Sequence, residues 1–443
     1  MHPSPFLEKI LRSLESIIPK PLYSFFQPAY HFSLATLGAF IYRFPSLEIK
    51  VVGVTGTKGK STTVEILASI LEEAGYRVAS LSTIRFRIDG EEKKNLFKMT
   101  VPGRFFVQKF LRQAVEKKCD FVVIEISSEA AKLYRNKYID LDAVIVTNLA
   151  PEHIESHGSF EKYRKAKLSI ARSLLRSRKK NTALILNSND ENLKPFFTIR
   201  VPNILPFSVS KLERKEIHGK QEFVYNGALI KTILPGEFNA SNIVGAAACA
   251  SFFHIPSETI ALAVSKIQKI RGRMEEVSEG QSFRCIVDYA HTKESLEAVY
   301  KAISERKICV LGGTGGGRDH WKRPEMGKVA NQYCAHIILT NEDPYGESPL
   351  KIIEEVRSGI SEAPTEIILD RREAIREALS LAKSPDAVVI TGKGTDPYIM
   401  EAGGKKTPWD DADVAREELQ KLLSKRNEPA RAEGRKDGSR KSP

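Results

Sequence analysis

The 443-residue sequence lacks an apolar run long enough to cross a membrane. Its most apolar stretch, Pro21 to Pro45, is interrupted by Pro28, His31 and Gly38 and falls below the roughly 20 consecutive apolar residues that a transmembrane helix needs. The stretch is nevertheless rich in aromatic residues and contains no acidic residue. We therefore expect it to pack against the main body of the protein, with contact to a membrane surface as the alternative.

The sequence also has few cysteines and no recognisable targeting signal. The five cysteines, at positions 119, 249, 285, 309 and 334, show neither paired metal-ligand spacing nor the pattern of a disulfide framework. This usage predicts a protein of the reducing cytoplasm. The first 48 residues lack the arrangement of a secretory signal, and residues 5–18 have the pattern of a short amphipathic helix.

Acidic residues are in deficit, which leaves a formal charge of +13. No aromatic-interleaved basic motif or nucleic-acid-binding module accompanies this charge. Part of the excess lies in the polar tail 426–443, which we expect to be disordered, and the rest suits an anionic small substrate as well as a polymer. We therefore expect small-molecule substrates, no nucleic-acid partner, no stable membrane insertion and a monomeric protein.

What the sequence does contain is a candidate phosphate-binding loop, IKVVGVTGTKGKSTT, at residues 49–63. An apolar, β-branched run predicts a buried strand, and Gly56 and Gly59 allow the backbone N–H groups to face an anion. Lys60 would reach the outer phosphates of a nucleotide, and the hydroxyl of Ser61 would be a ligand of Mg²⁺. Val54 replaces the first glycine of the usual G-x-x-x-x-G-K-[ST] pattern, so an ordinary strand-turn-helix junction is the alternative.

The pattern of apolar residues predicts two doubly wound α/β domains. The first series has strands near 77–83, 120–126, 142–149 and 182–187, with helices after Lys60 and near 104–118 and 159–177. The second has strands near 283–291, 307–313, 335–343, 365–370 and 386–394, with helices near 293–304, 323–333, 349–361, 371–382 and 411–425. Such alternation predicts mostly parallel sheets covered on both faces, with ligands at the carboxyl ends of the strands.

These elements predict a short helical segment (1–48), a central P-loop domain (49–271), a Rossmann-like C-terminal domain (272–425) and the tail (426–443). Glu125 ends one strand of the central domain, and Asn148 and His153 follow another, so all three should share the nucleotide site with Ser61. A glutamate in an apolar strand is costly unless it is paired or metal-bound, which favours a functional role for Glu125.

Several motifs, taken in order, resemble the Mur ligase family, ATP-dependent enzymes of peptidoglycan precursor synthesis, and within it the MurE type. The motifs are TGTKGKSTT (55–63), EISS (125–128), TNL (147–149), EHIESHG (152–158), YRKAK (163–167), GEFNASN (236–242), GRME (272–275), VDYAHTKESLE (287–297), GRDHWKRPEMG (317–327), NEDPYGE (341–347) and GKG (392–394). The resemblance implies an acid–amino-acid ligase that adds an amino acid to UDP-N-acetylmuramoyl-L-alanyl-D-glutamate through an acyl-phosphate intermediate.

The resemblance also implies the residues of the site. It implies catalytic roles for Lys60, Lys167 and His153, and two Mg²⁺ ions held by Ser61, Glu125, His153 and Lys167, the last as a carbamate. It implies ATP-binding roles for Gly56, Thr57, Lys58, Gly59, Lys60, Ser61, Thr62, Asn239, Asn242, Arg273, Asp288, Tyr289, His291, Asp319, Lys322 and Arg323. It implies substrate-binding roles for Thr100, Ser127, Arg135, Glu342, Asp343, Pro344, Tyr345, Gly392 and Lys393.

Four features depart from the family pattern. Only 48 residues precede Ile49, where relatives have a separate domain that grips the UDP group. Glu129 stands where relatives have histidine, and Thr395-Asp396 follows GKG where they have His-Glu. Tyr345 stands where the diaminopimelate-type motif has arginine, and tyrosine offers a hydroxyl in place of a charged fork. The sequence therefore does not predict which amino acid is added or whether the acceptor carries UDP.

Two alternatives follow from these departures. One is another ligase of the same fold that acts on a different carboxylate, for example a folylpolyglutamate synthase-like enzyme or one that uses a lipid-linked precursor. The other is a catalytically silent nucleotide-binding scaffold.

Overall fold

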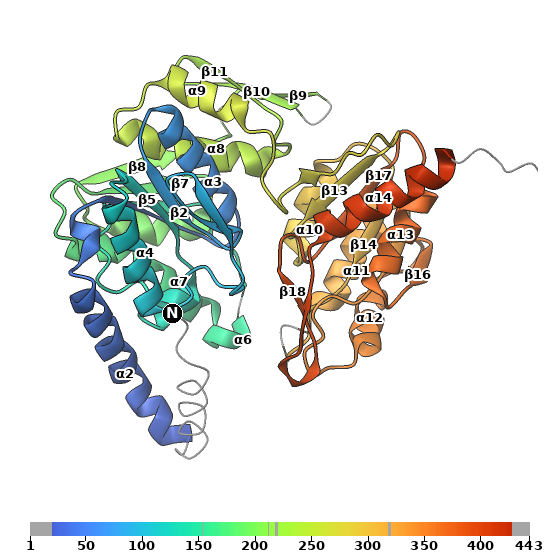
Figure 1. Cartoon of the computed structure of the whole chain (residues 1–443), viewed down its shortest axis with the longest axis horizontal. Helices are drawn as coiled ribbons and strands as arrows, with labels where there is room; N and C mark the ends of the chain where they lie inside the picture. The colour runs from blue at the N-terminus through green and yellow to red at the C-terminus, as the bar shows by residue number, and fades with distance from the viewer. Residues whose placement is uncertain (1–19, 153, 211, 218–219, 318–319, 428–443) are drawn as a thin grey trace, which may run out of the picture. The chain divides into compact units, whose positions relative to one another are not determined.

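The computed structural model describes residues 20–152, 154–210, 212–217, 220–317 and 320–427. The chain divides into two compact units, residues 1–270 and 271–443 (Figure 1). The helix predicted at 5–18 and the tail 428–443 lie outside the described residues.

The first unit is built on an eight-stranded sheet. Its strand order is β4-β3-β2-β5-β1-β6-β7-β8. The strands are β1 (Lys50–Thr55), β2 (Val78–Leu81), β3 (Arg85–Ile88), β4 (Glu91–Lys94), β5 (Phe121–Glu125), β6 (Ala143–Val146), β7 (Ala183–Asn187) and β8 (Asn203–Phe207). Along this order every neighbouring pair from β2 to β8 is parallel, whereas the β2–β3 and β3–β4 pairs at one edge are antiparallel. The prediction of a mostly parallel sheet is therefore confirmed.

Helices cover both faces of this sheet because its central strand is apolar on both sides. In β1, Val52 and Val54 join the core beneath α3 and α8, whereas Val51 joins the core beneath α4 and α7. The helices of this unit are α2 (Lys20–Ile41), α3 (Lys60–Glu73), α4 (Arg104–Glu116), α5 (Ser128–Lys132), α6 (Ile154–His157), α7 (Phe160–Ala171), α8 (Glu237–Phe252) and α9 (Ser257–Lys266). Strand β1 leads directly into α3, so the phosphate loop lies at the carboxyl edge of the sheet.

Helix α2 packs against the body of the first unit. Ala35 and Ala39 are buried, and the ring of Phe32 lies 6.3 Å from Tyr134 and 6.0 Å from Tyr138, centroid to centroid. The expectation that this aromatic segment packs on the main body is confirmed. The opposite face exposes several apolar side chains, with Phe40 72% exposed, and contact with a membrane surface stays a prediction. No helix among the described residues is long and apolar enough to cross a membrane.

Smaller elements complete the first unit. A three-stranded sheet of order β11-β10-β9 contains β9 (Lys215–Ile217), β10 (Lys220–Tyr225) and β11 (Ala228–Thr232). Short 3-10 helices span Pro45–Leu47, Arg172–Arg176 and Glu191–Thr198. The predicted helix 159–177 is thus an α-helix to Ala171 that continues as a 3-10 turn.

The second unit is also doubly wound. Its six-stranded sheet has the order β12-β13-β17-β14-β15-β16, in which only β12 is antiparallel to its neighbour. The strands are β12 (Glu275–Glu276), β13 (Arg284–Asp288), β14 (Lys307–Leu311), β15 (His336–Leu339), β16 (Thr365–Ile367) and β17 (Ala387–Thr391), with a separate hairpin of β18 (Tyr398–Met400) and β19 (Lys406–Pro408). The helices are α10 (Lys293–Lys301), α11 (Lys322–Tyr333), α12 (Pro349–Arg357), α13 (Arg371–Leu381) and α14 (Asp411–Asn427).

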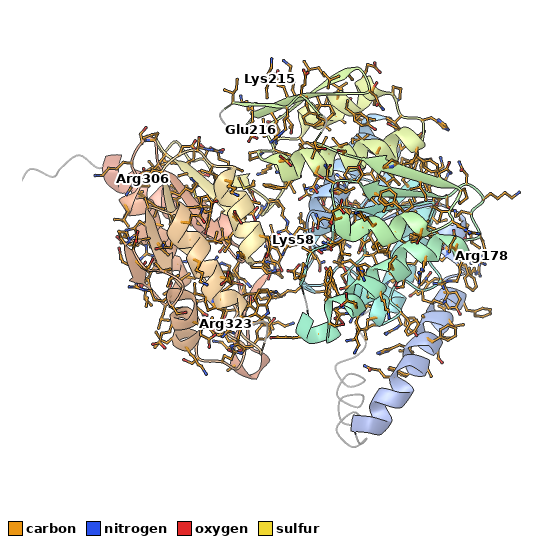
Figure 2. All side chains as sticks on the ribbon, turned by 180° about the vertical axis from the view of Figure 1, so that it is seen from behind. Lys58, Arg178, Lys215, Glu216, Arg306 and Arg323 are labelled. Atoms are coloured by element: carbon orange, nitrogen blue, oxygen red, sulfur yellow. A yellow bond between two sulfur atoms is a disulfide. The ribbon has the colours of Figure 1, made fainter. Side chains whose placement is uncertain are left out.

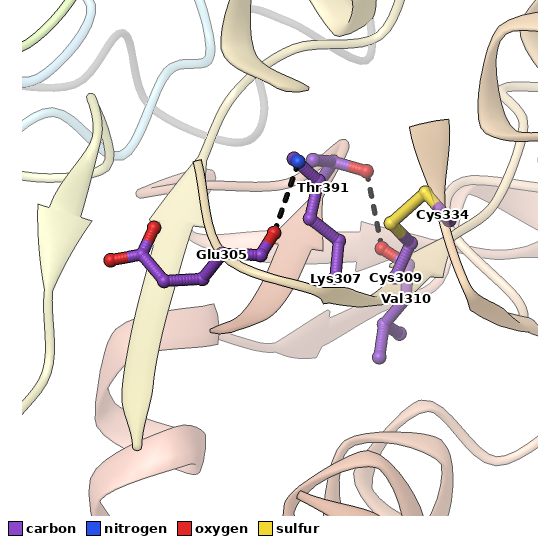
Figure 3. Close-up of a disulfide and its surroundings, with 6 residues drawn as sticks. All are labelled: Glu305, Lys307, Cys309, Val310, Cys334 and Thr391. Atoms are coloured by element: carbon purple, nitrogen blue, oxygen red, sulfur yellow. Dashed lines mark hydrogen bonds between the residues drawn. A yellow bond between two sulfur atoms is a disulfide. The ribbon is translucent and has the colours of Figure 1, made fainter. Parts of the chain in front are cut away.

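Two of the five cysteines form a disulfide, contrary to the expectation from their spacing. Cys309 in β14 and Cys334, which follows α11, have Cα atoms 6.0 Å apart and are bonded (Figure 3). The expectation was wrong because 25 residues separate the two cysteines, and only the return of the chain from α11 to the sheet brings them together. Cys119, Cys249 and Cys285 are free and buried.

Candidate active site

The phosphate loop of the first unit has the backbone geometry that its glycines predict. Gly56 has φ +146° and Gly59 has φ +80°. A Cβ atom at Gly56 would lie 1.9 Å from Oγ1 of Thr147, and one at Gly59 would lie 2.2 Å from Oδ1 of Asn242. Gly59 is also the N-cap of α3, where no side chain caps the helix. The loop therefore presents backbone N–H groups and the positive end of α3 to an anion.

Ser61 and Glu125 meet at the entrance to α3. The hydroxyl of Ser61 donates a hydrogen bond to Oε2 of Glu125, 2.9 Å away. The same carboxylate oxygen accepts from the backbone N–H of Thr83 at 2.9 Å, and Thr83 Oγ1 lies 2.8 Å from Ser61 Oγ. Both predicted ligands are buried and bring hard oxygen atoms together, which is the ligand chemistry that Mg²⁺ prefers.

Two lysines of the loop point in different directions. Lys60 Nζ donates to the carbonyl of Thr57 at 2.9 Å, so the side chain lies back over the loop that would hold the phosphates. Lys58 Nζ instead forms an ion pair with the buried carboxylate of Glu152 at 2.7 Å, and Figure 2 labels Lys58 on this loop. Thr57 is fixed by Tyr163, whose hydroxyl is 3.0 Å from Thr57 Oγ1. Thr62 is buried in the first turn of α3.

Lys167 of α7 is buried beside the phosphate loop. Its Nζ donates to the carbonyl of Gly56 at 2.6 Å and lies 4.8 Å from the ring centre of Tyr163. Burial lowers the pKa of Lys167 well below its usual value, and the charge of Lys60 lowers it further, against two nearby glutamates. The environment of Lys167 therefore favours the neutral amine more than water does.

The region after β6 is only partly described. His153, predicted as a metal ligand and catalytic residue, lies outside the described residues. His157 is buried with Nε2 3.1 Å from Ser128 Oγ and 3.2 Å from a carboxylate oxygen of Glu129, the residue that replaces the family histidine. Burial lowers the pKa of His157, and Glu129 partly opposes this. Within the described ranges no three His, Cys, Asp or Glu side chains form a metal-binding group.

Asparagines from two directions support the loop. Asn148 accepts from the backbone N–H of Lys58 at 2.8 Å through its side-chain oxygen. Asn242 of α8 lies against Gly59 and is 3.4 Å from Thr63 Oγ1, while Asn239 donates to the carbonyl of Pro235 at 2.8 Å. Helix α8 therefore stands directly behind the first turn of α3, where the resemblance expects contact with the nucleotide base.

Three predicted substrate residues lie together beyond β5. Thr100 Oγ1 donates to Ser127 Oγ at 3.0 Å, and Ser127 is the N-cap of α5. Arg135, in the loop after α5, donates to the carbonyl of Val101 at 3.1 Å. All three therefore stand at the same edge of the sheet as Glu125.

In the second unit, four predicted nucleotide residues cluster just before β12 and around the carboxyl end of β13. The guanidinium of Arg273 lies 4.4 Å from the ring centre of Tyr289, whose ring is 4.8 Å from that of His291. Asp288 ends β13, where its carboxylate accepts from the backbone N–H groups of Met274 and Ala290, each at 2.7 Å. Asp288 thus fixes the two turns that carry the aromatic and cationic side chains.

Arg323, in the GRDHWKR motif, contacts residues of its own unit. Arg323 is 2% exposed and donates to Glu355 at 2.7 Å and to Glu347 and the carbonyl of Thr314 at 2.9 Å (Figure 2). Its side chain therefore orders the glycine-rich loop, and its contact with a nucleotide stays a prediction. Lys322 Nζ lies 5.8 Å from the ring of Trp321. Asp319 lies outside the described residues.

The predicted amino-acid residues meet at the carboxyl ends of β15 and β17. Lys393 Nζ forms a buried ion pair with Asp343 at 2.7 Å. Glu342 accepts from Thr314 at 2.7 Å through Oε1. Its buried Oε2 has no hydrogen-bond partner among the described residues and would be 2.4 Å from a Cβ atom at Gly392. Burial raises the pKa of Glu342, and the neighbouring charge of Asp343 raises it further.

Tyr345 and Pro344 form the turn that follows. Tyr345 has φ +52°, and its backbone N–H donates to the carbonyl of Met400 at 2.9 Å. Its ring lies against Gly316, and the carbonyl of Pro344 lies against Gly315. The turn is therefore packed tightly on the glycine-rich loop after β14.

Four residues around the phosphate loop were not selected from the sequence. They are Thr83, Glu152, His157 and Tyr163, which contact Ser61, Lys58, Ser128 and Thr57, respectively. Glu152, His157 and Tyr163 lie inside the quoted motifs, so their presence in EHIESHG and YRKAK was an available signal. Thr83 lies in none of them, and only the pairing of β2 with β5 brings it to Glu125.

A glycine-rich phosphate loop at the carboxyl edge of a parallel sheet defines a nucleotide-binding protein of the P-loop class. The chain matches the Mur ligase middle domain over residues 54–250 and the Mur ligase glutamate ligase domain over residues 272–394. The chain belongs to the Mur ligase family, whose members are ATP-dependent ligases.

Individual relatives agree with this assignment. The chain is 35% identical over 404 residues to the UDP-N-acetylmuramoyl-L-alanyl-D-glutamate–2,6-diaminopimelate ligase of Syntrophomonas wolfei. This match covers 87% of this chain and 81% of the relative. It is 32% identical to the UDP-N-acetylmuramyl-tripeptide synthetase of Treponema denticola, covering 87% and 79%. The fold is similar to that of Mycobacterium tuberculosis folylpolyglutamate synthase, with a TM-score of 0.66 and 15% sequence identity. This match covers 81% of this chain and 92% of the synthase.

Proposed function

We propose that this protein is an ATP-dependent ligase of peptidoglycan precursor synthesis that adds an amino acid to UDP-N-acetylmuramoyl-L-alanyl-D-glutamate. The observation that carries the proposal is the group formed by the phosphate loop, the Ser61–Glu125 pair and the buried Lys167. The names of the two relatives support the choice of acceptor.

The reaction has two steps with balanced bonds. The acceptor carboxylate attacks the γ-phosphorus of ATP, which forms an acyl phosphate and releases ADP. The amine of the amino acid then attacks the acyl carbon, phosphate leaves, and the nitrogen loses a proton. Because two anions must approach each other in the first step, cations and N–H donors fixed in place lower its barrier. Lys60 and the N–H groups after Gly56 and Gly59 supply them here.

The donor set of this unit fits Mg²⁺. The Ser61 hydroxyl and the Glu125 carboxylate are hard oxygen donors held 2.9 Å apart beside the phosphate loop. When bound there, Mg²⁺ supplies positive charge to the transferring phosphoryl group. Thr83 keeps the Glu125 carboxylate oriented through its backbone N–H, so the pair is set before ligands arrive.

Lys167 is suited to carry a carbamate. A carbamate forms when a neutral amine attacks CO₂ and loses a proton, so it requires a lysine whose pKa is lowered. Burial and the charge of Lys60 give Lys167 that property. The product has carboxylate oxygens in place of an ammonium group, which would turn Lys167 into an oxygen ligand and reverse its repulsion of Lys60.

The test is a direct assay. The protein is incubated with UDP-N-acetylmuramoyl-L-alanyl-D-glutamate, ATP, Mg²⁺ and a panel of amino acids, and ADP release and the tripeptide product are measured. The panel includes amino acids with and without a second carboxylate, because Tyr345 offers a hydroxyl where the diaminopimelate-type motif has arginine. We expect ADP and product with at least one amino acid; the absence of ADP with all of them would refute the proposal.

A second arm of the assay uses acceptors without UDP, namely a pteroyl glutamate and a lipid-linked muramoyl dipeptide. ADP release that requires an amine and one of these acceptors, with none from the UDP-dipeptide, would favour a different ligase of the same fold. Binding of ATP without turnover in any mixture would favour a silent nucleotide-binding protein.

A further inference from the structure

Two arginines of the first unit, Arg104 and Arg135, each donate a hydrogen bond to a carbonyl close in sequence to the other. Arg104 is the first residue of α4, and one guanidinium nitrogen donates to the carbonyl of Leu133 in the loop that carries Arg135. Arg135 in turn donates to the carbonyl of Val101, just before α4, at 3.1 Å. These crossed hydrogen bonds fix both guanidinium groups between the same two loops.

Neither guanidinium has a carboxylate partner among the residues that the structure describes. Their hydrogen bonds go to the carbonyls of Leu133 and Val101 and to the sulfur of Met99 at 3.1 Å. Nε of Arg104 is buried and has no hydrogen-bond partner within the described part of the chain. By contrast, Arg112 of the same helix forms an ion pair with Glu48 at 2.6 Å.

The two charges are also unfavourable to each other. Burial lowers the pKa of both Arg104 and Arg135, and the charge of Arg135 lowers the pKa of Arg104 further. The charge of Glu129 opposes this effect at Arg135, but Glu129 forms no ion pair with Arg135 among the described residues. A half-buried pair of like charges without a directly bonded carboxylate costs stability unless a ligand supplies the opposite charge. The pair therefore has the properties of a site that is completed by an anion.

The surroundings of the pair connect it to the phosphate loop. Thr100, four residues before Arg104, bonds to Ser127, and Ser127 follows Glu125 by two residues at the end of β5. Helix α4 has Gly103 as its N-cap, with no side-chain cap and no acidic residue in its first turn, so its positive end adds to the field of the arginines. Helix α2 lies beside the first residues of α4, where Gly38 packs against the backbone of Arg104.

We propose that Arg104 is a second anion-binding residue for the acceptor and that it forms, with Arg135, a two-guanidinium clamp for an oxyanion of that substrate. The oxyanion is a group that is not phosphorylated in the reaction, either a carboxylate of the peptide or the diphosphate of UDP. Both offer the paired oxygen atoms that a planar guanidinium fork binds. The inference rests on the proposed function, in which the acceptor carries both groups. No motif that supports the family resemblance contains Arg104.

The kinetic test uses Arg104→Gln and Arg104→Lys in the full chain. We expect Arg104→Gln to raise the KM for the acceptor by about tenfold or more, because a charge-assisted hydrogen bond is lost, with kcat and the KM for ATP nearly unchanged. Arg104→Lys keeps the charge without the fork and should have an intermediate KM. Arg112→Gln, on the same helix, is the matched control and should leave the KM for the acceptor unchanged.

Thermal unfolding separates a clamp from a merely structural arginine. If Arg104 only braced the Leu133 loop, Arg104→Gln would lower the Tm of the ligand-free protein and leave the KM for the acceptor within twofold of wild type, and that result would overturn the proposal. A clamp predicts that the KM for the acceptor rises whatever the ligand-free Tm does, because Arg104→Gln loses the hydrogen bond to Leu133 and also relieves a like-charge repulsion. It also predicts that the Tm increase caused by the acceptor becomes smaller in the variant.

Two fragments distinguish the source of the oxyanion and keep the test independent of turnover. The Tm of wild type and Arg104→Gln is measured with L-alanyl-D-glutamate and, separately, with UDP. A stabilisation of wild type by one fragment that is lost in the variant supports the clamp and identifies the carboxylate or the diphosphate as its ligand. Equal stabilisation of both proteins by both fragments overturns it. If wild type fails to turn over the UDP-dipeptide, the proposed function fails, while this measurement still decides the clamp.

Discussion

Lys167 Nζ donates a hydrogen bond to the carbonyl oxygen of Gly56, 2.6 Å away, so that a buried lysine of α7 touches the backbone of the phosphate loop. Lys60 donates to the carbonyl of Thr57 in the same loop. Its charge lowers the pKa of Lys167 beyond the effect of burial. An unmodified Lys167 is therefore a poor partner for this site when it is protonated, and a good nucleophile for CO₂ when it is neutral.

The first prediction concerns this amine. In ¹³C-labelled bicarbonate, wild type should show a carbamate signal by NMR that is absent in Lys167→Met, and the variant should lose at least about a hundredfold in turnover because an oxygen ligand is missing. The signal should weaken as the pH falls through the pKa of Lys167 in the folded protein, because a protonated amine does not attack CO₂. An identical signal in the variant would assign the carbamate to another residue.

The sign of the stability effect follows from the same pKa. Because the pKa of Lys167 is lower in the folded protein than in the unfolded chain, the unfolded state binds more protons between the two values. In CO₂-free buffer, the stability of wild type relative to Lys167→Met should therefore rise with pH over that range. A Tm difference that falls with rising pH would contradict the buried, destabilised ammonium group.

The second prediction uses two glycines that share a backbone conformation but differ in their surroundings. Gly59 (φ +80°) would bring a Cβ to 2.2 Å from Asn242, whereas Gly75 (φ +87°) has nothing within 4 Å. Gly75→Ala should cost only the left-handed strain, about 1–2 kcal/mol of stability, and keep activity. Gly59→Ala should also displace the loop from the phosphates and lower turnover by about a hundredfold. Similar turnover in both variants would show that the contact with Asn242 is not important.

The third prediction tests the Ser61–Glu125 pair. Ser61→Ala and Glu125→Gln should each reduce turnover at least about tenfold and raise the Mg²⁺ concentration needed for half-maximal rate, because each removes a hard oxygen ligand. Ser61→Thr keeps a hydroxyl at the same position and should stay within a few-fold of wild type. The measurement is the rate of ADP release over a Mg²⁺ titration; equal Mg²⁺ dependence in all variants would exclude both residues as ligands.

How far the sequence alone predicts this structure depends on the range of the contacts. The order of strands and helices follows from local periodicity, as β1 and α3 illustrate, and the approach of Glu125 to Ser61 follows from the rule that parallel strands end at one edge. The β3–β4 hairpin was missed because β4, EEKK, is exposed throughout and carries no apolar pattern. The three-stranded sheet β11-β10-β9 was missed as well.

Contacts that depend on tertiary register could not be predicted. Thr83 reaches Glu125 only because β2 pairs with β5, and Cys309 meets Cys334 only after the chain returns from α11. The environment of Arg104 could not be predicted either, because the sequence does not show that its guanidinium bonds to the Leu133 carbonyl and not to a carboxylate. The contacts of Arg323 with Glu355 and Glu347 likewise depend on tertiary register, and its nucleotide contact stays a prediction.

The last prediction concerns Glu342 in the second unit. Burial raises the pKa of Glu342, and the charge of Asp343 raises it further. Its Oε2 atom is buried and finds no hydrogen-bond partner in the residues that the structure describes. For an acid whose pKa is raised in the folded state, the folded state binds the extra proton, so stability is lost as the pH rises from the unfolded value through the folded one. Glu342→Gln removes this titration and keeps an acceptor for Thr314. The variant should therefore gain stability relative to wild type as the pH rises, by up to about 1.4 kcal/mol per pH unit within that window, measured by urea denaturation.

Glu354→Gln, on the exposed side of α12, is the control and should show no such trend. A constant difference between Glu342→Gln and wild type at all pH values would mean that Glu342 is ionised and compensated in the folded protein.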